Sequence, residues 1–162
     1  MMGRMHFTHT MTYDASLAEV GAMLDDPAYR DRVIVAQKSI EGTATFEQVG
    51  DRVVVVVDVV QPADDIPGFA RKFVGNRINV VQREEWTSAD HADLHVTIPG
   101  RPGQMVGSIE LTEAGGVTTE TVDCEITVHI PLVGGKLERL IGDLLLKALR
   151  AEEQVARDYL SR

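Results

Sequence analysis

The sequence predicts an α+β fold in which a curved antiparallel sheet of about seven strands packs against one long C-terminal helix. Several segments alternate apolar and polar residues, which is typical of strands with one buried face. The end of the chain has a turn at residues 130–135, followed by an amphipathic helix from Lys136 to Leu160. At about 1.5 Å per residue this helix measures about 37 Å, which is long enough to cross a whole sheet.

The first strand is expected at residues 5–12, where alternation puts Phe7 and His9 on the inward face. Ser16 and Glu19 then have the spacing of a capping box. In this motif the serine hydroxyl accepts from the glutamate amide, and the glutamate carboxylate accepts from the serine amide. A short helix is therefore expected to begin after Ser16.

A second short helix and a hairpin are expected next. Asp26 is a good N-cap and Pro27 suits the first helical position, so this helix runs to about residue 36. Two strands follow at residues 40–49 and 52–60, and the Gly-Asp turn between them predicts a hairpin.

A long connection follows the hairpin. In residues 64–75 the apolar side chains Ile66, Phe69, Phe73 and Val74 recur at helical spacing between two turn signals. We expect one or two helical turns here. This segment is either a mobile lid over the opening between sheet and helix or a fixed plug that fills the core.

Four strands complete the predicted sheet, and short connections between them indicate hairpins. The strands are expected at residues 77–87, 91–98, 104–113 and 117–130. The closing helix carries one broad apolar stripe that faces the sheet. Its charged residues, among them Glu138 and Glu153, are expected on the opposite side.

Length and composition favour one domain. A chain of 162 residues can bury a full hydrophobic core, so we expect a single domain over residues 5–162 after a short N-terminal extension, residues 1–4. The single cysteine, Cys124, excludes an intramolecular disulfide. The first residues lack the apolar run of a signal peptide, so we expect a cytoplasmic protein.

The charge balance narrows the possible partners. The formal net charge of −9 works against nucleic-acid binding, which draws on clustered lysine and arginine. The most apolar stretch, Val53 to Val60, is too short to span a bilayer and contains Asp58. We therefore expect neither nucleic-acid binding nor stable membrane insertion, while a monomer and a homodimer both remain open.

Three segments resemble a known family. They read Ile-Pro-Leu-Val-Gly-Gly-Lys-Leu-Glu at 130–138, Ile-Pro-Gly-Phe-Ala-Arg-Lys-Phe-Val at 66–74 and Glu-Glu-Trp at 84–86. With the order strand, two short helices, six strands and a long helix, the chain is identified as a member of the START-like (SRPBCC, helix-grip) superfamily. It is similar to the branch catalogued as domain of unknown function 2505. The resemblance implies a curved sheet that grips the last helix.

The wider superfamily includes lipid-transfer domains, hormone receptors and polyketide cyclases, so fold alone does not choose a function. The sequence also holds no catalytic signature such as a phosphate loop or a nucleophile elbow. Candidate residues are therefore polar side chains that share a face with inward apolar ones. They are His9, Gln82, Glu84 and Glu120.

Each candidate has a structural alternative. His9 is a core histidine if the backbone satisfies its ring, a bulge would turn Gln82 and Glu84 outward, and Glu120 lies near a strand end where exposure is common. If Glu84 and Glu120 face one cavity, burial and mutual repulsion raise the pKa of at least one of them. That carboxyl would then be an acid or a hydrogen-bond donor.

A ligand between sheet and helix would touch the inward faces of both. The expected contacts are Phe7, His9, Phe69, Phe73, Val80, Gln82, Glu84, Trp86, Leu94, Ile109, Val122, Cys124, Ile126, Leu137, Ile141, Leu144 and Ala148. Every histidine except His9 falls on the outward face, so we expect no metal site, and we expect no cofactor.

Three functions follow from these observations. The leading one is binding or carriage of a small hydrophobic or amphipathic, lipid-like ligand in a cavity between sheet and helix. The second is a polyketide cyclase or dehydratase-like enzyme that uses Glu84, Glu120 or His9. The third is a protein-interaction domain whose cavity is vestigial. Of these, catalysis is less favoured than binding.

Overall fold

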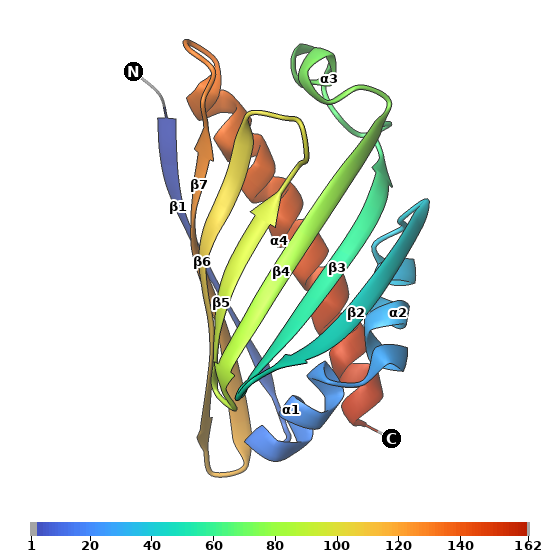
Figure 1. Cartoon of the computed structure of the whole chain (residues 1–162), viewed down its shortest axis with the longest axis vertical. Coiled ribbons are helices and arrows are strands. Elements are labelled where there is room, and N and C mark those ends of the chain that lie inside the picture. The colour runs from blue at the N-terminus through green and yellow to red at the C-terminus, as the bar shows by residue number, and fades with distance from the viewer. Residues whose placement is uncertain (1–2, 162) are drawn as a thin grey trace.

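The computed structural model describes residues 3–161, which form one antiparallel sheet and four helices (Figure 1). The strand order is β1-β7-β6-β5-β4-β3-β2, so the first strand lies beside the last. The strands are β1 (Gly3–Tyr13), β2 (Glu41–Val49), β3 (Arg52–Pro62), β4 (Arg77–Ser88), β5 (His91–Thr97), β6 (Gly103–Ala114) and β7 (Val117–Val128). The helices are α1 (Leu17–Leu24), α2 (Pro27–Ala36), α3 (Gly68–Val74) and α4 (Gly134–Leu160).

The predicted fold class and element order are confirmed, and element ends differ by only a few residues. β1 includes Gly3 and Arg4, which belong to the segment predicted as a short N-terminal extension. Residues 1 and 2 lie outside the described part of the chain. α4 begins at Gly134, two residues before the expected start at Lys136.

The helices occupy distinct places on the sheet (Figure 1). α4 runs across one face, approaches the sheet backbone most closely at β1 and β7, and also meets α1 and α2. α1 and α2 lie at one end of the sheet and α3 lies at the other. None of the helices in the described residues is long and apolar enough to span a membrane.

Local signals explain where the first two helices begin. The Ser16 hydroxyl accepts from the Glu19 amide at 3.1 Å, and the Glu19 carboxylate accepts from the Ser16 amide at 3.0 Å, which confirms the capping box. Asp26 accepts from the Ala28 amide at 2.9 Å. Its other oxygen accepts from the Tyr159 hydroxyl at 2.7 Å, so the start of α2 is also tied to the end of α4.

Two glycines allow close approaches that a side chain would prevent. A Cβ at Gly107 of β6 would lie 1.9 Å from the carbonyl oxygen of Asp123 on β7. A Cβ at Gly142 of α4 would lie 2.4 Å from the terminal methyl of Met5 on β1. Glycine therefore lets β6 fit against β7 and lets α4 lie close over β1.

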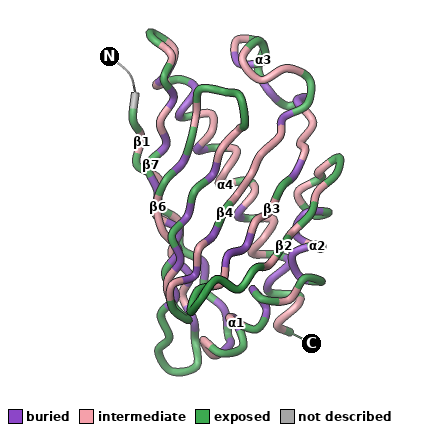
Figure 2. Tube along the Cα trace, viewed as in Figure 1, coloured by how far each residue is buried: buried purple, intermediate pink, exposed green. Residues whose placement is uncertain are grey.

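The core divides into two clusters, and buried positions alternate with exposed ones along the strands (Figure 2). The larger cluster lies between the sheet, α1, α2 and the C-terminal half of α4. The smaller one includes Ile66 and Ala70, with Phe69 and Phe73 packed partly against it. In this structure α3 thus fills one end of the core.

One charged residue of α4 does not lie where the helical pattern predicts. Glu138 was expected on the outward side of the helix, but it is 1% exposed. Its carboxylate accepts from the Val128 amide at the end of β7, at 2.9 Å. The reason is that a buried backbone amide at a strand end needs an acceptor, and Glu138 supplies it.

Candidate functional site

A buried ion pair lies at the centre of the larger cluster. Arg30 of α2 is 4% exposed and Glu84 of β4 is 2% exposed. The two terminal nitrogens of the guanidinium each donate to one carboxylate oxygen of Glu84, both at 2.9 Å. The remaining nitrogen, Nε, donates to the Leu24 carbonyl oxygen at 2.8 Å. Every nitrogen of Arg30 is therefore already paired, in the fork geometry that favours carboxylates.

Glu84 has two further donors from its own strand. The Trp86 indole N–H donates at 2.9 Å and the Gln82 amide donates at 2.6 Å. Burial alone would raise the pKa of Glu84, but Arg30 and these two donors outweigh it, so the pKa lies below its usual range. Glu84 is thus a permanent anion. The register irregularity in β4 lies between Trp86 and Ser88, after Glu84, so the alternation holds here.

A small cavity adjoins this ion pair, between the sheet and α4. The space open to the centre of a water molecule is about 20 Å³, which is enough for about one water. Most of the side chains that line it are apolar, and the others are three carboxyls and one amide. The lining residues are Leu24, Gln82, Glu84, Leu94, Val96, Met105, Ile109, Glu120, Val122, Leu145, Leu149 and Glu152.

Glu120 of β7 and Glu152 of α4 are the two other carboxyls in this wall. Burial, with the nearby charges of Glu152 and Glu84, raises the pKa of Glu120 to about 8. Burial and the charge of Glu84 also raise the pKa of Glu152 to about 7, against the lowering effects of Arg30 and of hydrogen bonding by Tyr29. Near neutral pH the two carboxyls therefore hold at least one proton between them. Glu120 is 3% exposed, which overturns the expectation that its position near a strand end leaves it in solvent.

Two tyrosine hydroxyls stand beside these carboxyls. The Tyr13 hydroxyl donates to Glu120 at 3.5 Å, a long contact. Tyr29 is 1% exposed, and its hydroxyl makes no hydrogen bond of ordinary geometry to a described residue. Burial, then the charges of Glu152 and Glu120, raise the pKa of Tyr29, so both tyrosines stay protonated. Tyr13 also lines an outer groove of about 400 Å³ near the end of α4.

Comparison with known proteins places the chain in a family. Residues 8–160 match the family described as protein of unknown function (DUF2505). The chain belongs to this family. Uncharacterized protein Rv0481c of Mycobacterium tuberculosis is 26% identical to this DUF2505 protein over 164 residues, which cover 91% of this chain and 92% of the relative. Uncharacterized protein Mb0491c of Mycobacterium bovis matches it with the same figures.

Solved structures share the START-like fold of the DUF2505 protein. A START superfamily protein from Mycobacterium smegmatis has a TM-score of 0.61 at 14% identity, over 98% of this chain and 99% of its own. TTHA0849 from Thermus thermophilus has a TM-score of 0.61 at 17% identity, over 94% and 97%. The di-domain ARO/CYC BexL has a TM-score of 0.62 at 15% identity, over 96% of this chain but only 49% of its own. These identities establish the fold and not the activity.

The cavity of the DUF2505 protein includes some of the side chains that alternation put inward. Gln82, Glu84, Leu94, Ile109 and Val122 line it, and Glu120 joins them. Twelve expected ligand contacts do not line it. They are Phe7, His9, Phe69, Phe73, Val80, Trp86, Cys124, Ile126, Leu137, Ile141, Leu144 and Ala148. The physical reason is that side chains from α1, α2 and α4 fill most of the space between the sheet and α4, where the sequence predicts a cavity.

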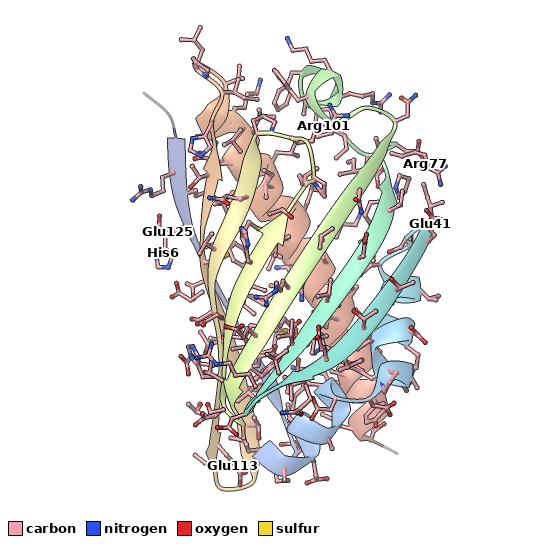
Figure 3. All side chains as sticks on the ribbon, viewed as in Figure 1. His6, Glu41, Arg77, Arg101, Glu113 and Glu125 are labelled. Atoms are coloured by element: carbon pink, nitrogen blue, oxygen red, sulfur yellow. The ribbon has the colours of Figure 1, made fainter. Side chains whose placement is uncertain are left out.

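His9 illustrates this difference. It lies on the inward side of β1, but its ring does not reach the cavity, and its Nε2 is buried without a hydrogen-bond partner among the described residues. No backbone group of the described residues therefore bonds to this nitrogen. The other histidines of the DUF2505 protein lie on the outer face. His6 projects there beside Glu125 (Figure 3) and binds Asp123 at 2.7 Å.

Sequence reasoning missed Arg30, Tyr29 and Glu152, although each left a signal. Arg30 and Tyr29 share a face of α2 with Val33 and Ile34, so the charged side chain of Arg30 lies on the apolar face of this helix. Glu152 similarly falls between Leu149 and Val155 on α4. A charged residue at a core-facing helix position needs a partner, and asking for that partner would have indicated Glu84.

Proposed function

We propose that this protein binds a small amphipathic molecule between the sheet and α4. The polar end of the molecule would lie against Glu120 and Glu152, and its apolar part would lie along Leu94, Leu145 and Leu149. The observation that carries the proposal is the two cavity carboxyls, because neither is paired with a cation in the described residues. Burying such groups opposes folding, and they concentrate where a ligand or a reaction requires them.

Binding requires the cavity to open. Pockets for small ligands usually measure about 300–1,000 Å³, whereas the space here is about 20 Å³. Leu145 and Leu149 form the helical wall of the cavity, and α4 approaches the sheet backbone most closely elsewhere, at β1 and β7. The wall that faces β4 and β5 is therefore the part we expect to yield when a ligand enters.

An NMR titration tests the proposal. The protein would carry methyl labels on its leucines and valines and would be titrated with 1-octanol. We expect chemical-shift changes at Leu94, Leu145 and Leu149, and not at Leu137 or Val128 of the smaller cluster. The variant Leu145→Ala widens the cavity and should bind octanol more tightly. Shifts confined to the outer groove, or none at all, would contradict the proposal and favour an interaction domain with a closed cavity.

Acid–base catalysis is the second candidate, and one observation favours it. The pKa values of Glu152, about 7, and Glu120, about 8, both lie near neutral pH, where one carboxyl can donate a proton while the other accepts one. Among proteins that share the fold, BexL and StfQ are di-domain ARO/CYC proteins of biosynthetic pathways. The reaction would be a cyclisation or dehydration of a poly-β-ketone.

Loss of water from a linear poly-β-ketone, followed by mass spectrometry, tests this candidate. Activity should vanish in both Glu120→Gln and Glu152→Gln. An unchanged substrate, or a rate that these variants leave intact, would remove the catalytic role and leave the binding proposal standing.

A further inference from the structure

The charges around the cavity are unbalanced. Glu84, Glu120 and Glu152 reach it from β4, β7 and α4, and no lysine, arginine or histidine lines it in the described chain. The cation whose charge acts on Glu120 and Glu152 is Arg30, and both terminal nitrogens of its guanidinium donate to Glu84. Within the described residues Arg30 forms an ion pair with Glu84 and not with Glu120 or Glu152.

Hydrogen-bond donors are scarce in the same place. The amide of Gln82 and the indole of Trp86 both donate to Glu84. Glu120 has only the long contact from Tyr13. For Glu152 the donor is the buried Tyr29 hydroxyl, whose hydrogen bonding lowers the pKa of Glu152 but does not outweigh burial, and which has no partner of ordinary geometry among the described residues. The site therefore offers acceptors and lacks a donor-rich cation.

We infer that the ligand carries a protonated amine at its polar end, and that Glu120 and Glu152 receive this ammonium group together. An ammonium group supplies one positive charge and up to three donors, which complements two carboxylates and a tyrosine oxygen. A carboxylate at the same place would meet like charges, and a hydroxyl would supply a single donor. This inference rests on the proposed function and names the ligand class for the same cavity.

Binding of an amine is then linked to proton release. Without ligand, the raised pKa values of Glu120 and Glu152 leave at least one proton on the pair at pH 7. An ammonium group favours the ionised pair, so that proton leaves when the ligand binds. Affinity should rise with pH between about 6 and 8.5, because an alkylamine itself stays protonated up to about pH 10.

Several other groups face this pair, and their states fix the direction of the linkage. Glu84 stays ionised and Arg30 stays protonated, since each pKa is shifted in favour of the charged form. Tyr13 and Tyr29 stay neutral. Asp25, at the end of α1, has a pKa raised by partial burial. Glu84, Arg30 and the two tyrosines keep their charge states between pH 6 and 8.5, and Asp25 does not line the cavity, so the release reports on Glu120 and Glu152.

Isothermal titration calorimetry with three ligands of equal chain length tests the inference. Octylamine, 1-octanol and octanoate would be titrated at pH 7.0 in phosphate and in HEPES, whose ionisation enthalpies differ. Octylamine should bind at least about tenfold more tightly than octanol, and its apparent enthalpy should change with buffer as proton release requires. Octanoate should bind most weakly.

Three variants locate the effect. Glu120→Gln and Glu152→Gln should each weaken octylamine binding about tenfold, reduce its proton release and weaken octylamine binding by a larger factor than octanol binding. Glu153→Gln is the matched control, because this neighbouring carboxylate pairs with Arg157 at 2.8 Å and does not line the cavity. Should a glutamine variant fail to fold, the buffer dependence of the unmodified protein decides alone.

The outcomes separate this inference from the proposed function. If octanol binds as tightly as octylamine, or octylamine binds without releasing a proton, the amine assignment is wrong and the binding proposal stands. If none of the three ligands binds, the proposed function fails and the amine assignment fails with it.

Discussion

Glu84 and Glu120 are identical side chains on one face of the same sheet, and their surroundings shift their pKa values in opposite directions. Glu84 has Arg30 and two neutral donors, so its charge is stabilised despite burial. Glu120 has one distant hydroxyl and two neighbouring carboxyls, so burial prevails. Glu84 is therefore an anion with a structural role, and Glu120 is the carboxyl that can take up or release a proton in the cavity.

Replacing Glu84 tests this structural role. Glu84→Gln leaves the Arg30 guanidinium buried without its counterion, so the free energy of unfolding should fall by about 3–5 kcal/mol in urea denaturation. Glu85→Gln is the control, because this carboxylate pairs with Arg52 at the surface of the same strand. It should change stability by no more than about 1 kcal/mol. Equal effects of the two substitutions would show that the Arg30 pair contributes nothing specific.

The sequence predicted part of the site at this scale. Strand alternation placed Gln82, Glu84 and Glu120 together because a strand fixes side-chain direction with a period of two. It gave no reason to pair Glu84 with Arg30, which is 54 residues away on a helix. The rotation and depth of a helix depend on packing, which a local pattern does not contain.

At the scale of elements, two glycines set how closely the layers fit. Gly107 meets the backbone of β7, since a Cβ there would lie 2.5 Å from the Cα of Cys124. The close contact at Gly142 is with the flexible end of Met5, and the Cδ1 of Ile126 lies at an ordinary contact distance of 3.7 Å. Backbone in a paired strand cannot move aside as a side-chain terminus can, so the two positions should tolerate a methyl group very differently.

A matched pair of alanine substitutions tests this difference. Gly107→Ala should lower the free energy of unfolding by at least about 3 kcal/mol, because β6 and β7 must separate locally. Gly142→Ala should stay within about 1 kcal/mol, since the higher helix propensity of alanine offsets the displacement of the Met5 methyl. Thermal unfolding followed by circular dichroism measures both. Tolerance of alanine at 107 would contradict the close contact with β7.

At the scale of the whole molecule, Glu120 and Glu152 make stability depend on pH. Both pKa values are raised from 4.5, to about 8 and about 7. Below pH 4.5 the carboxyls are protonated in the folded and the unfolded chain, so they do not lower the free energy of unfolding. As pH rises towards 8 only the unfolded chain releases these protons readily, so the free energy of unfolding falls.

Glu120→Gln isolates this contribution. Each titrating carboxyl lowers the free energy of unfolding by at most about 1.4 kcal/mol per pH unit. Urea denaturation at pH 5, 7 and 9 should therefore show a smaller loss of stability in Glu120→Gln than in the unmodified protein. Titrating groups remote from Glu120 are common to both proteins and cancel in the difference, and the loss of a like charge beside Glu152 acts in the same direction. Parallel pH profiles would mean that Glu120 keeps an ordinary pKa in the folded protein.

The whole architecture was predictable because strand alternation, caps and turns repeat the same information along the chain. The nearly filled interior was not, since the volume left between a sheet and a helix depends on how all the side chains pack. Leu24 of α1 and Leu149 of α4 show this, because both fill space that the strand pattern alone leaves open.

The pairing of β1 with β7 has a consequence for synthesis of the protein on the ribosome. From β2 to β6, each strand pairs with the one that follows it, so this part of the sheet can form as it emerges. β1 must wait for its partner, which follows it by more than a hundred residues. Tyr13 and Glu120 meet only through that pairing, and Glu152 is made later still. The carboxyl pair is therefore assembled only after residue 152 has been translated.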